Sequence, residues 1–332
     1  MTQRKGIILA GGSGTRLYPI TKGISKQLMP VYDKPMVYYP LSVLMLAGIR
    51  EIAIITTPTD QAQFRQLLGN GAQWGLSFTY IPQPSPDGLA QAYLLTEDFL
   101  DGAPSAMVLG DNIFHGDGLS DLLTDADHQR GGATVFGYQV PDPERYGVVG
   151  MNALGQVTEI IEKPTVPPSN LAVTGLYFLD ETAPDRARQI RPSERGELEI
   201  STLLDMYLQD RQLAVQKMGR GFAWLDTGTH NSLLEAGNFI HNLQARQGIQ
   251  TGSPEAIAYE MGWINDKKLR LLAKQYHKSE YGRYLLDMLP EIETNISGFP
   301  AFEADRFKAA VADSPSHLAP FGEDHLVYPV VG

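Results

Sequence analysis

A glycine-rich segment follows the first apolar run of the chain and has the composition of a phosphate-binding loop. Residues 11–16 read Gly-Gly-Ser-Gly-Thr-Arg and come directly after the strand-like run 6–10. Glycines leave several backbone N–H groups unobstructed by Cβ atoms, as a triphosphate cradle requires. The P-loop spacing is absent, and Leu17 stands where a dinucleotide-binding fingerprint needs its third glycine. For the glycines alone, a tight strand-to-helix turn explains the segment equally well.

Two cations near this segment favour the phosphate interpretation. Arg16 ends the glycine segment, and Lys26 follows it closely. Their charges can neutralise the β- and γ-phosphates of a nucleotide as these leave as pyrophosphate, whereas a plain turn needs neither cation. An arginine binds phosphate through two parallel hydrogen bonds, a role that lysine fills poorly. We therefore expect turnover to depend most on Arg16, with Lys26 as the second catalytic cation.

Two aspartates follow apolar runs and are candidate metal ligands. Asp111 comes after residues 107–110, and Asp226 comes after Trp224 and Leu225. Carboxylates at two separate strand ends offer hard oxygen ligands that suit Mg²⁺, which usually keeps several waters and bridges phosphate oxygens. Taken singly, each aspartate is more often a cap or a turn residue.

A charged pair ends another predicted strand. Glu162 and Lys163 follow residues 157–161, and Pro164 stops the strand and fixes the turn that presents both side chains. Without further context, a surface ion pair is the more usual explanation. A small phosphorylated substrate nevertheless needs only a few locally placed cations.

The composition of the 332-residue chain excludes several functions. It contains no cysteine, which rules out disulfides, thiolate metal sites and a cysteine nucleophile and fits a reducing compartment such as the cytoplasm. The histidines form no cluster typical of zinc, and no serine lies in a hydrolase elbow. A formal charge of −11 without a basic block disfavours nucleic-acid binding. No apolar run is long enough for a membrane span, and we expect no signal peptide.

The order of the predicted elements indicates the fold class. Strand-like runs alternate with helical segments over the first two thirds of the chain, which predicts an α/β fold with a Rossmann-like, mainly parallel central sheet flanked by helices. The glycine segment would then lie at the carboxyl edge of the first strand, where open α/β sheets bind ligands. Further strands are expected at residues 51–56, 77–81, 106–110, 133–140, 147–151, 157–161 and 173–179. Helices are expected at residues 36–48, 200–209, 232–246, 254–262, 266–274 and 279–289.

The glycine segment belongs to a longer stretch that resembles the signature of the sugar nucleotidyltransferases. That stretch comprises residues 11–21, 25–31 and 33–36. Later segments resemble the glucose-1-phosphate thymidylyltransferase branch of the family, in family order: residues 83–84, 88–92, 109–112, 162–164, 173–177, 195–200 and 224–229. The resemblance covers roughly residues 5–289.

The resemblance implies roles for individual residues. Gln83 would pair with the imide edge of thymine or uracil, and Gly88 would let the base approach the backbone. The implied nucleotide-binding set is Gly11, Gly14, Thr15, Arg16, Lys26, Gln83, Gly88 and Asp111. The implied sugar-phosphate-binding set is Asn112, Tyr146, Gly147, Glu162, Lys163, Val173, Tyr177 and Trp224. The implied Mg²⁺ ligands are Asp111 and Asp226.

The resemblance also implies a reaction. The family transfers a nucleotidyl group, here from dTTP to α-D-glucose 1-phosphate, and forms dTDP-glucose and pyrophosphate as the first step of dTDP-deoxysugar synthesis, for example of rhamnose. The sugar phosphate is already anionic, so a single in-line displacement needs neither an enzyme nucleophile nor a general base. A cytoplasmic homotetramer is implied, with these two small molecules as partners and neither nucleic acid nor membrane.

Domain boundaries follow from the same pattern. Residues 1–250 are expected to form the nucleotidyltransferase domain, with a nucleotide half at about 1–132 and a sugar-binding half at about 133–250. Residues 251–289 would form a helical segment typical of the family. Residues 290–332 have no clear periodicity and no counterpart in the family pattern, and they predict an extra C-terminal tail of unknown role.

Three other functions remain open at this stage. UTP or another sugar 1-phosphate could replace the expected substrates, since few contacts separate such substrates. A non-catalytic nucleotide-sugar-binding regulatory protein would not need the complete set of charged residues. A Rossmann oxidoreductase would need the missing third glycine.

Some segments depart from the family pattern. Ser201 and Thr202 replace the usual Thr-Asp, and we expect Ser201 to keep a phosphate contact. Residues 113–117 and 253–260 also differ from the family pattern. In the family these segments belong to a secondary nucleotide site, through which end-product sugars inhibit the enzymes. Because His115, Asp117 and Glu260 change its charge toward negative, we expect feedback inhibition by a nucleoside diphosphate sugar to be weakened or lost.

Overall fold

The computed structural model describes residues 2–12 and 14–290. Contacts divide the chain into a compact unit, Met1–Leu289, and a second unit, Pro290–Gly332. The predicted tail lies outside the described residues from position 291 onward, as does Ser13 of the glycine segment. None of the described helices is both long and apolar enough to cross a membrane.

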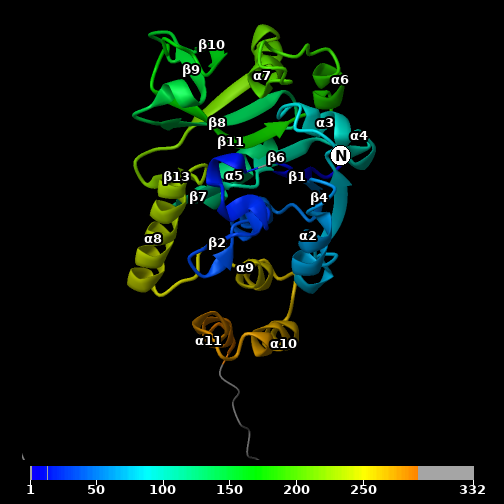
Figure 1. The fold of residues 1–332 in the computed structure, drawn as a ribbon, viewed down its shortest axis with the longest axis vertical. Coiled ribbons are helices and arrows are strands. Elements are labelled where there is room, and N and C mark those ends of the chain that lie inside the picture. The colour runs from blue at the N-terminus through cyan, green and yellow to red at the C-terminus, as the bar shows by residue number, and fades with distance from the viewer. Residues whose placement is uncertain (1, 13, 291–332) are drawn as a thin grey trace, which may run out of the picture. The chain divides into compact units, whose positions relative to one another are not determined.

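The first part of the compact unit is a parallel sheet. Strands β1 (Lys5–Ala10), β4 (Glu51–Thr56), β5 (Ser77–Pro82) and β6 (Ser105–Leu109) lie in the order β6-β1-β4-β5 with every neighbouring pair parallel. Their carboxyl ends therefore meet at one edge of the sheet (Figure 1). This confirms the predicted α/β fold and places the glycine segment at that edge, directly after β1.

The same sheet continues into a mainly antiparallel part. The central strand β11 (Leu171–Leu179) is buried along its whole length and pairs antiparallel with β6, β8 (Ala133–Gln139) and β9 (Gly147–Met151). The strand β10 (Val157–Glu162) pairs with β9, and β12 (Leu213–Lys217) adds a parallel strand beside β8. The two parts of the chain thus share one continuous sheet.

Two small ribbons complete the strand structure. The strand β7 (Asn112–Gly116), close behind β6, pairs antiparallel with β13 (Phe222–Asp226), and β2 (Pro30–Val31) pairs with β3 (Lys34–Pro35). The first ribbon joins segments about a hundred residues apart in the sequence. It carries Asn112 and Asp226 on adjacent strands, directly opposite one another.

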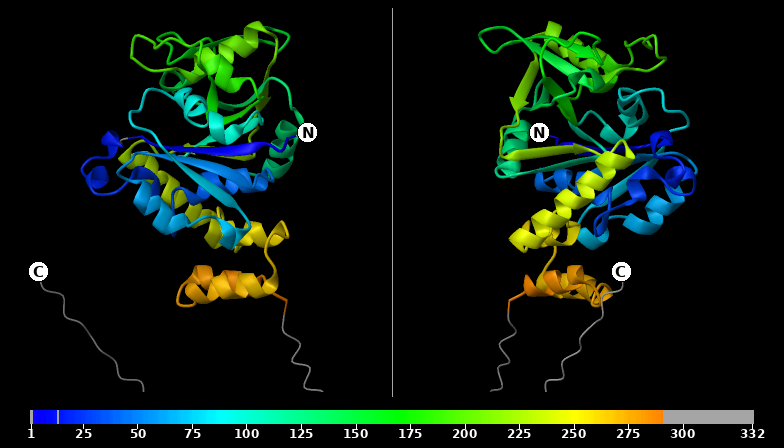
Figure 2. Two further views of the ribbon diagram at one scale, coloured as in Figure 1. Left: turned by 90° about the vertical axis from the view of Figure 1, so that its right-hand side faces the viewer. Right: turned by 60° about the vertical axis from the view of Figure 1, so that its left-hand side comes forward.

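Helices cover the sheet and extend beyond it. In Figures 1 and 2, the last two helices lie at the opposite end of the compact unit from β9 and β10. The helices are α1 (Tyr38–Leu46), α2 (Gln61–Leu68), α3 (Gln91–Leu95), α4 (Glu97–Leu100), α5 (Leu119–His128), α6 (Ala183–Ala187), α7 (Ile200–Gln209), α8 (His230–Gln247), α9 (Pro254–Glu260), α10 (Asp266–Gln275) and α11 (Glu280–Asp287).

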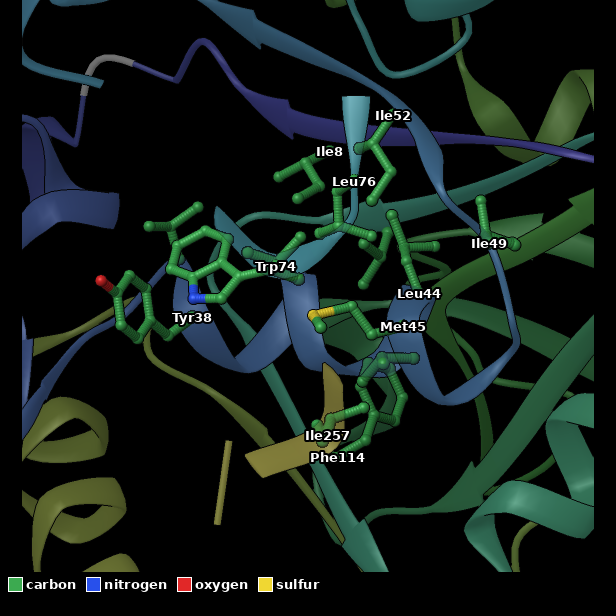
Figure 3. Close-up of a cluster of buried hydrophobic side chains, with 14 of the residues drawn as sticks. Ile8, Tyr38, Leu44, Met45, Ile49, Ile52, Trp74, Leu76, Phe114 and Ile257 are labelled. Carbon is green, nitrogen blue, oxygen red and sulfur yellow. The ribbon is translucent and has the colours of Figure 1, made fainter. Parts of the chain in front are cut away.

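Alternating side chains of β1 separate two hydrophobic cores. Ile8 packs in a core with residues of α1, α2, α5 and α9, whereas Ile7 and Leu9 belong to a core with α3, α6 and α7. The alternation follows from the two-residue period of a strand, with successive side chains on opposite faces. Helix α1 is apolar on all sides and lies inside the first core, where Tyr38 and Met45 pack near Trp74 (Figure 3). Both faces of the sheet are therefore covered, and its edge is left for the site.

Candidate active site

The glycine segment forms a tight turn that leaves its cation exposed. Gly14 has a left-handed φ of 60° and precedes a single 3₁₀ turn over Thr15–Leu17. The hydroxyl of Thr21 donates to the Gly14 carbonyl at 2.7 Å and holds the end of the loop. Leu17 is buried, whereas Thr15 and Arg16 are exposed. The local fold thus anchors the loop by its apolar residue and directs its charge to solvent.

Gln83 lies against the start of this loop. It follows β5, and its N–H donates to the Thr56 carbonyl at 2.8 Å. A Cβ atom at position 11 would lie 1.9 Å from Gln83 Oε1, so any larger residue there would force the Gln83 side chain to move. The structure therefore brings Gly11 and Gln83, two predicted nucleotide-binding residues, into direct contact. Gly88 has a φ of +110°, and a Cβ there would lie 2.4 Å from the Leu198 carbonyl oxygen; its role beside a base stays a prediction.

Asp111 and Asp226 are brought together by the β7–β13 ribbon. Asp111 lies between β6 and β7, and Asp226 is the last residue of β13, opposite Asn112. The hydroxyl of Thr227 donates to the Asp111 carbonyl at 2.8 Å and fixes the two chain segments to each other. Burial and the nearby charge of Asp111 raise the pKa of Asp226, while Lys26, Arg145 and Arg16 act in the opposite direction. Two adjacent carboxylates that repel each other favour a bound cation.

Protein cations already lie beside these carboxylates. Lys26 is buried in a short 3₁₀ turn, Lys26–Leu28, and its ammonium forms a salt bridge with Asp111 Oδ2. The guanidinium of Arg145 lies 3.8 Å from Asp226 Oδ2. In the described part of the chain no group of three or more His, Asp or Glu side chains could hold a metal ion, and the candidate ligands here are the two aspartates. Such a donor set fits Mg²⁺, whose remaining ligands are commonly water and phosphate oxygens.

The predicted sugar-side residues gather where β9, β10 and β11 meet. Glu162 ends β10 and pairs in register with Gly147, the first residue of β9, and a Cβ at Gly147 would lie 3.4 Å from Glu162 Oε2 and 4.0 Å from the Val173 Cβ. Burial raises the pKa of Glu162, and the charge of Lys163, with Nζ 3.8 Å from Oε1, partly opposes that shift. Lys163 has a left-handed φ of 43° and leaves the strand at that point. Tyr177 lies four residues beyond Val173 on β11 and is buried.

Asn112 is held by a tryptophan. Trp224 Nε1 donates to Asn112 Oδ1 at 2.6 Å, and Asn112 Nδ2 donates to Asp111 Oδ1 at 2.9 Å. The indole packs on Tyr146, with ring centroids 5.1 Å apart. Because its N–H is already used by Asn112, the structure gives Trp224 a positioning contact. Direct contact of Trp224 or Tyr146 with a sugar stays a prediction.

Two arginines of the site were not among the predicted residues. Arg145 lies beside Asp226, and Arg195 Nη2 lies 3.6 Å from Glu162 Oε1 and 2.8 Å from Glu199 Oε1. Arg195 begins the segment 195–200, one of those that carry the family resemblance, so its position in that segment was a usable signal. No comparable sequence signal marks Arg145. Arg195, Glu162 and Ser201 line one cavity of about 460 Å³.

The three residues expected to weaken feedback inhibition also lie together. His115, Asp117 and Glu260 line another cavity of about 450 Å³, between α1, β7 and α9. Burial lowers the pKa of His115 and raises the pKa of Glu260. The residues that line this cavity do not include Asp111 or Glu162. The structure therefore supports treating the three residues as one candidate secondary site.

Comparison with known proteins gives a consistent result. The family model described as "Nucleotidyl transferase" matches residues 5–242. The chain is 64% identical over 285 residues to a glucose-1-phosphate thymidylyltransferase of Xanthomonas campestris pv. campestris, which covers 86% of this chain and 97% of the relative. It is 52% identical over 285 residues to a protein of the same name from Mycolicibacterium smegmatis, covering 86% of this chain and 99% of the relative.

Solved structures show the same fold. A crystal structure from Bacillus anthracis, of a protein provisionally named a glucose-1-phosphate thymidylyltransferase and in complex with a sucrose, superimposes with a TM-score of 0.68. It is 40% identical and covers 76% of this chain and 98% of that chain. A UDP-glucose pyrophosphorylase complexed with UDP-glucose has a TM-score of 0.65 at 24% identity and covers 73% of this chain and all of that one, a likeness of fold alone.

Proposed function

Because the chain belongs to the nucleotidyl transferase family, among the glucose-1-phosphate thymidylyltransferases, we propose that it transfers a thymidylyl group from dTTP to α-D-glucose 1-phosphate. The products are dTDP-glucose and pyrophosphate. The observation that carries the proposal is the meeting of the Asp111–Asp226 pair with Lys26 at the sheet edge that bears the glycine loop. Together these groups form a site for a chelated triphosphate.

The reaction is a single in-line displacement at the α-phosphorus. An oxygen of the sugar phosphate forms the new P–O bond as the bond to the pyrophosphate oxygen breaks. The attacking oxygen is already anionic, so the protein has to bring two anions together and stabilise charge. Arg16 is exposed at the end of the glycine loop, where it contacts the phosphates on which charge builds. No side chain acts as nucleophile or general base.

Asp111 and Asp226 would hold Mg²⁺, which supplies positive charge to the phosphate oxygens. Lys26 lies on the same carboxylate and contributes a second positive charge beside the phosphates. Asn112 is fixed between Asp111 and Trp224, and its position contacts the sugar phosphate. These contacts hold the metal carboxylates in place.

The sugar half binds the acceptor. Glu162 accepts hydrogen bonds from sugar hydroxyls, and Lys163 and Arg195, which both lie near Glu162 Oε1, supply positive charge for the sugar phosphate. Gly147 and Val173 line the sugar beside Glu162. The half-buried Glu162 accepts hydrogen bonds from both oxygens, and most strongly, when it is ionised, which ties sugar binding to pH.

The cellular context is also proposed. We infer that the protein works in the cytoplasm as a homotetramer and that its product is used for dTDP-deoxysugar synthesis, for example of rhamnose. The close similarity to the named relatives supports these points, and the absence of cysteine fits a reducing compartment.

Pyrophosphate release tests the function. The full chain is incubated with dTTP, UTP, dCTP and dATP, each with glucose 1-phosphate, galactose 1-phosphate or glucosamine 1-phosphate, with Mg²⁺ or with EDTA. We expect the fastest release from dTTP with glucose 1-phosphate, and none in EDTA. Faster release with UTP or with another sugar would assign the same chemistry to that substrate. No release from any pair, together with measurable dTDP-glucose binding, would contradict catalysis and support a binding protein.

A further inference from the structure

A chain of polar side chains leads from solvent to Gln83, the residue beside Gly11. We propose that Asp87 and Gln91 are positioning residues that fix which end of the Gln83 amide faces the base, and so select thymine or uracil over cytosine. The inference rests on the proposed function, since it assumes that Gln83 meets the base of the nucleotide.

The first step is the orientation of Gln91. Gln91 Nε2 donates to Asp87 Oδ2 at 2.8 Å, and the Asp87 N–H lies 3.3 Å from Gln91 Oε1. An ionised carboxylate only accepts hydrogen bonds and a backbone N–H only donates, so both contacts require the same amide orientation. Asp87 therefore forces the oxygen of Gln91 away from its own carboxylate.

The second step passes this orientation to Gln83. Gln83 Nε2 donates to Gln91 Oε1 at 2.7 Å. With the Gln91 oxygen fixed, Gln83 must turn its NH₂ group toward Gln91 and its Oε1 toward Gly11, the observed arrangement. Gln83 is 5% exposed, so rotating its amide would leave a nearly buried group mispaired. The carboxylate of Asp87 thus determines the direction of an amide that it does not touch.

The third step is the match to a base. A fixed Gln83 offers one acceptor, Oε1, and one remaining N–H, because the other N–H is used by Gln91. Thymine and uracil carry an N3–H donor beside a carbonyl acceptor, which is the complementary pattern. Cytosine carries an N3 acceptor beside an amino donor, which is the opposite pattern. A freely rotating glutamine would pair with either base, whereas the fixed one rejects cytosine.

The loop that carries Asp87 is itself held by the protein. The Leu198 N–H donates to the Asp87 carbonyl at 2.7 Å, and the Ala90 N–H donates to the Leu198 carbonyl at 3.1 Å. The Ser85 hydroxyl donates to Asp87 Oδ2 at 2.6 Å. Asp87 is therefore set in place by backbone contacts with the segment 195–200.

Two variants test the relay. In Asp87→Asn, the new amide can donate to Gln91 Oε1, so Gln91 and Gln83 can both adopt the reversed orientation. We expect kcat/KM for dTTP to fall about tenfold and the preference for dTTP over dCTP to fall by at least about tenfold, the scale of one mispaired buried hydrogen bond. The KM for glucose 1-phosphate should not change.

The double variant Asp87→Asn with Gln91→Glu restores the chain of hydrogen bonds from residue 87 through residue 91 to Gln83, with the amide now at position 87 and the carboxylate at position 91. The new amide donates to the new carboxylate, which accepts from Gln83 Nε2 and fixes it in the original direction, at unchanged net charge. We expect the preference for dTTP over dCTP to return to within about threefold of the wild-type value. If Asp87 only stabilised the loop, the second substitution should lower the activity further and should not restore the preference for dTTP over dCTP.

The measurements are steady-state rates with dTTP, UTP and dCTP, and calorimetric binding of dTTP and dCTP without sugar phosphate. Asp98→Asn, an exposed carboxylate on α4, is the matched control for loss of a charge and should behave as wild type. If wild type prefers dTTP and Asp87→Asn leaves that preference unchanged, the relay is overturned. If wild type uses neither dTTP nor UTP, the proposed function itself fails, and base selection with it.

Discussion

In the part of the sheet built from β1, β4, β5 and β6, the site residues follow the ends of parallel strands, whereas in the part built from β9 to β11 they lie within paired antiparallel strands. Gly11 and Gln83 belong to loops after strands, and Asp111 lies in the short link between β6 and β7. Glu162 and Gly147 face each other across a strand pair. The first arrangement supplies backbone donors and charges for phosphates, and the second supplies a pocket of fixed shape. Substitutions should therefore affect chemistry in the first part and sugar affinity in the second.

The largest effect is expected from Arg16. Arg16→Ala removes a charge that stabilises the departing pyrophosphate, and we expect turnover to fall by at least about a hundredfold. Steady-state pyrophosphate release at saturating substrates measures the change. Lys22→Ala, which removes an exposed cation from the same region, is the control and should leave turnover near normal. Near-normal turnover in the Arg16 variant would contradict its catalytic role.

A substitution of Asp226 tests whether Asp111 and Asp226 bind a metal ion, with a measurement that does not depend on activity. Asp226→Asn removes one of two carboxylates, and we expect the affinity for Mn²⁺, used as a probe for Mg²⁺, to fall by about a hundredfold. Calorimetry or electron paramagnetic resonance of the full chain measures it, with Asp98→Asn as the control. Unchanged Mn²⁺ affinity would place the metal elsewhere. A thermal melt shows whether the variant is folded.

Glu162 should separate sugar binding from nucleotide binding. We expect Glu162→Gln to raise KM for glucose 1-phosphate by about tenfold while KM for dTTP stays the same. An equal rise in both values would remove the distinction between the two parts of the sheet.

The pKa of Glu162 gives a matching pH dependence. Because burial raises this pKa, the carboxylate takes up its proton at a higher pH than an ordinary glutamate. As pH falls through the raised pKa, the ionised acceptor is lost and KM for glucose 1-phosphate rises. The same pH series with Glu162→Gln corrects for the ionisation of the sugar phosphate itself. Identical pH profiles for the two proteins would count against the ionised acceptor.

The smallest effect is expected at the candidate secondary site. Wild-type enzyme should be inhibited only weakly by dTDP-rhamnose, since Glu260 and Asp117 place negative charge where a diphosphate would lie. Glu260→Arg should strengthen inhibition by about fivefold without changing kcat. Strong inhibition of the wild-type protein would refute the expectation.

The parts of the fold that local sequence pattern determines were predicted well. The strand expected at residues 51–56 is β4, and the helix expected at residues 200–209 is α7. Helix α1 starts two residues later than expected, because Met36 and Val37 still belong to the turn after β3. These elements have clear apolar runs, and local residues decide their limits.

The site was predicted less completely, for a physical reason. The β7–β13 ribbon joins residues 112–116 to residues 222–226, and no local pattern indicates a pairing over that separation. The contact of Trp224 with Asn112 depends on this ribbon. Arg145 lies in the short 3₁₀ turn before β9, and no local pattern indicates its approach to Asp226. The family resemblance predicted which residues form the site, but it did not show how they contact one another.

The strand β11 has a mechanical consequence for the enzyme. It is hydrogen-bonded to β8 on one side and to β6 and β9 on the other, so the two parts of the site share one continuous ladder of hydrogen bonds. The two parts of the site cannot move apart by a hinge motion, as the domains of a two-domain enzyme do, without breaking these hydrogen bonds. The shared ladder therefore fixes the distance between the aspartate pair and Glu162. A sugar phosphate that is too long or too short for this distance should be a poor substrate, because the site has no hinge with which to adjust to it.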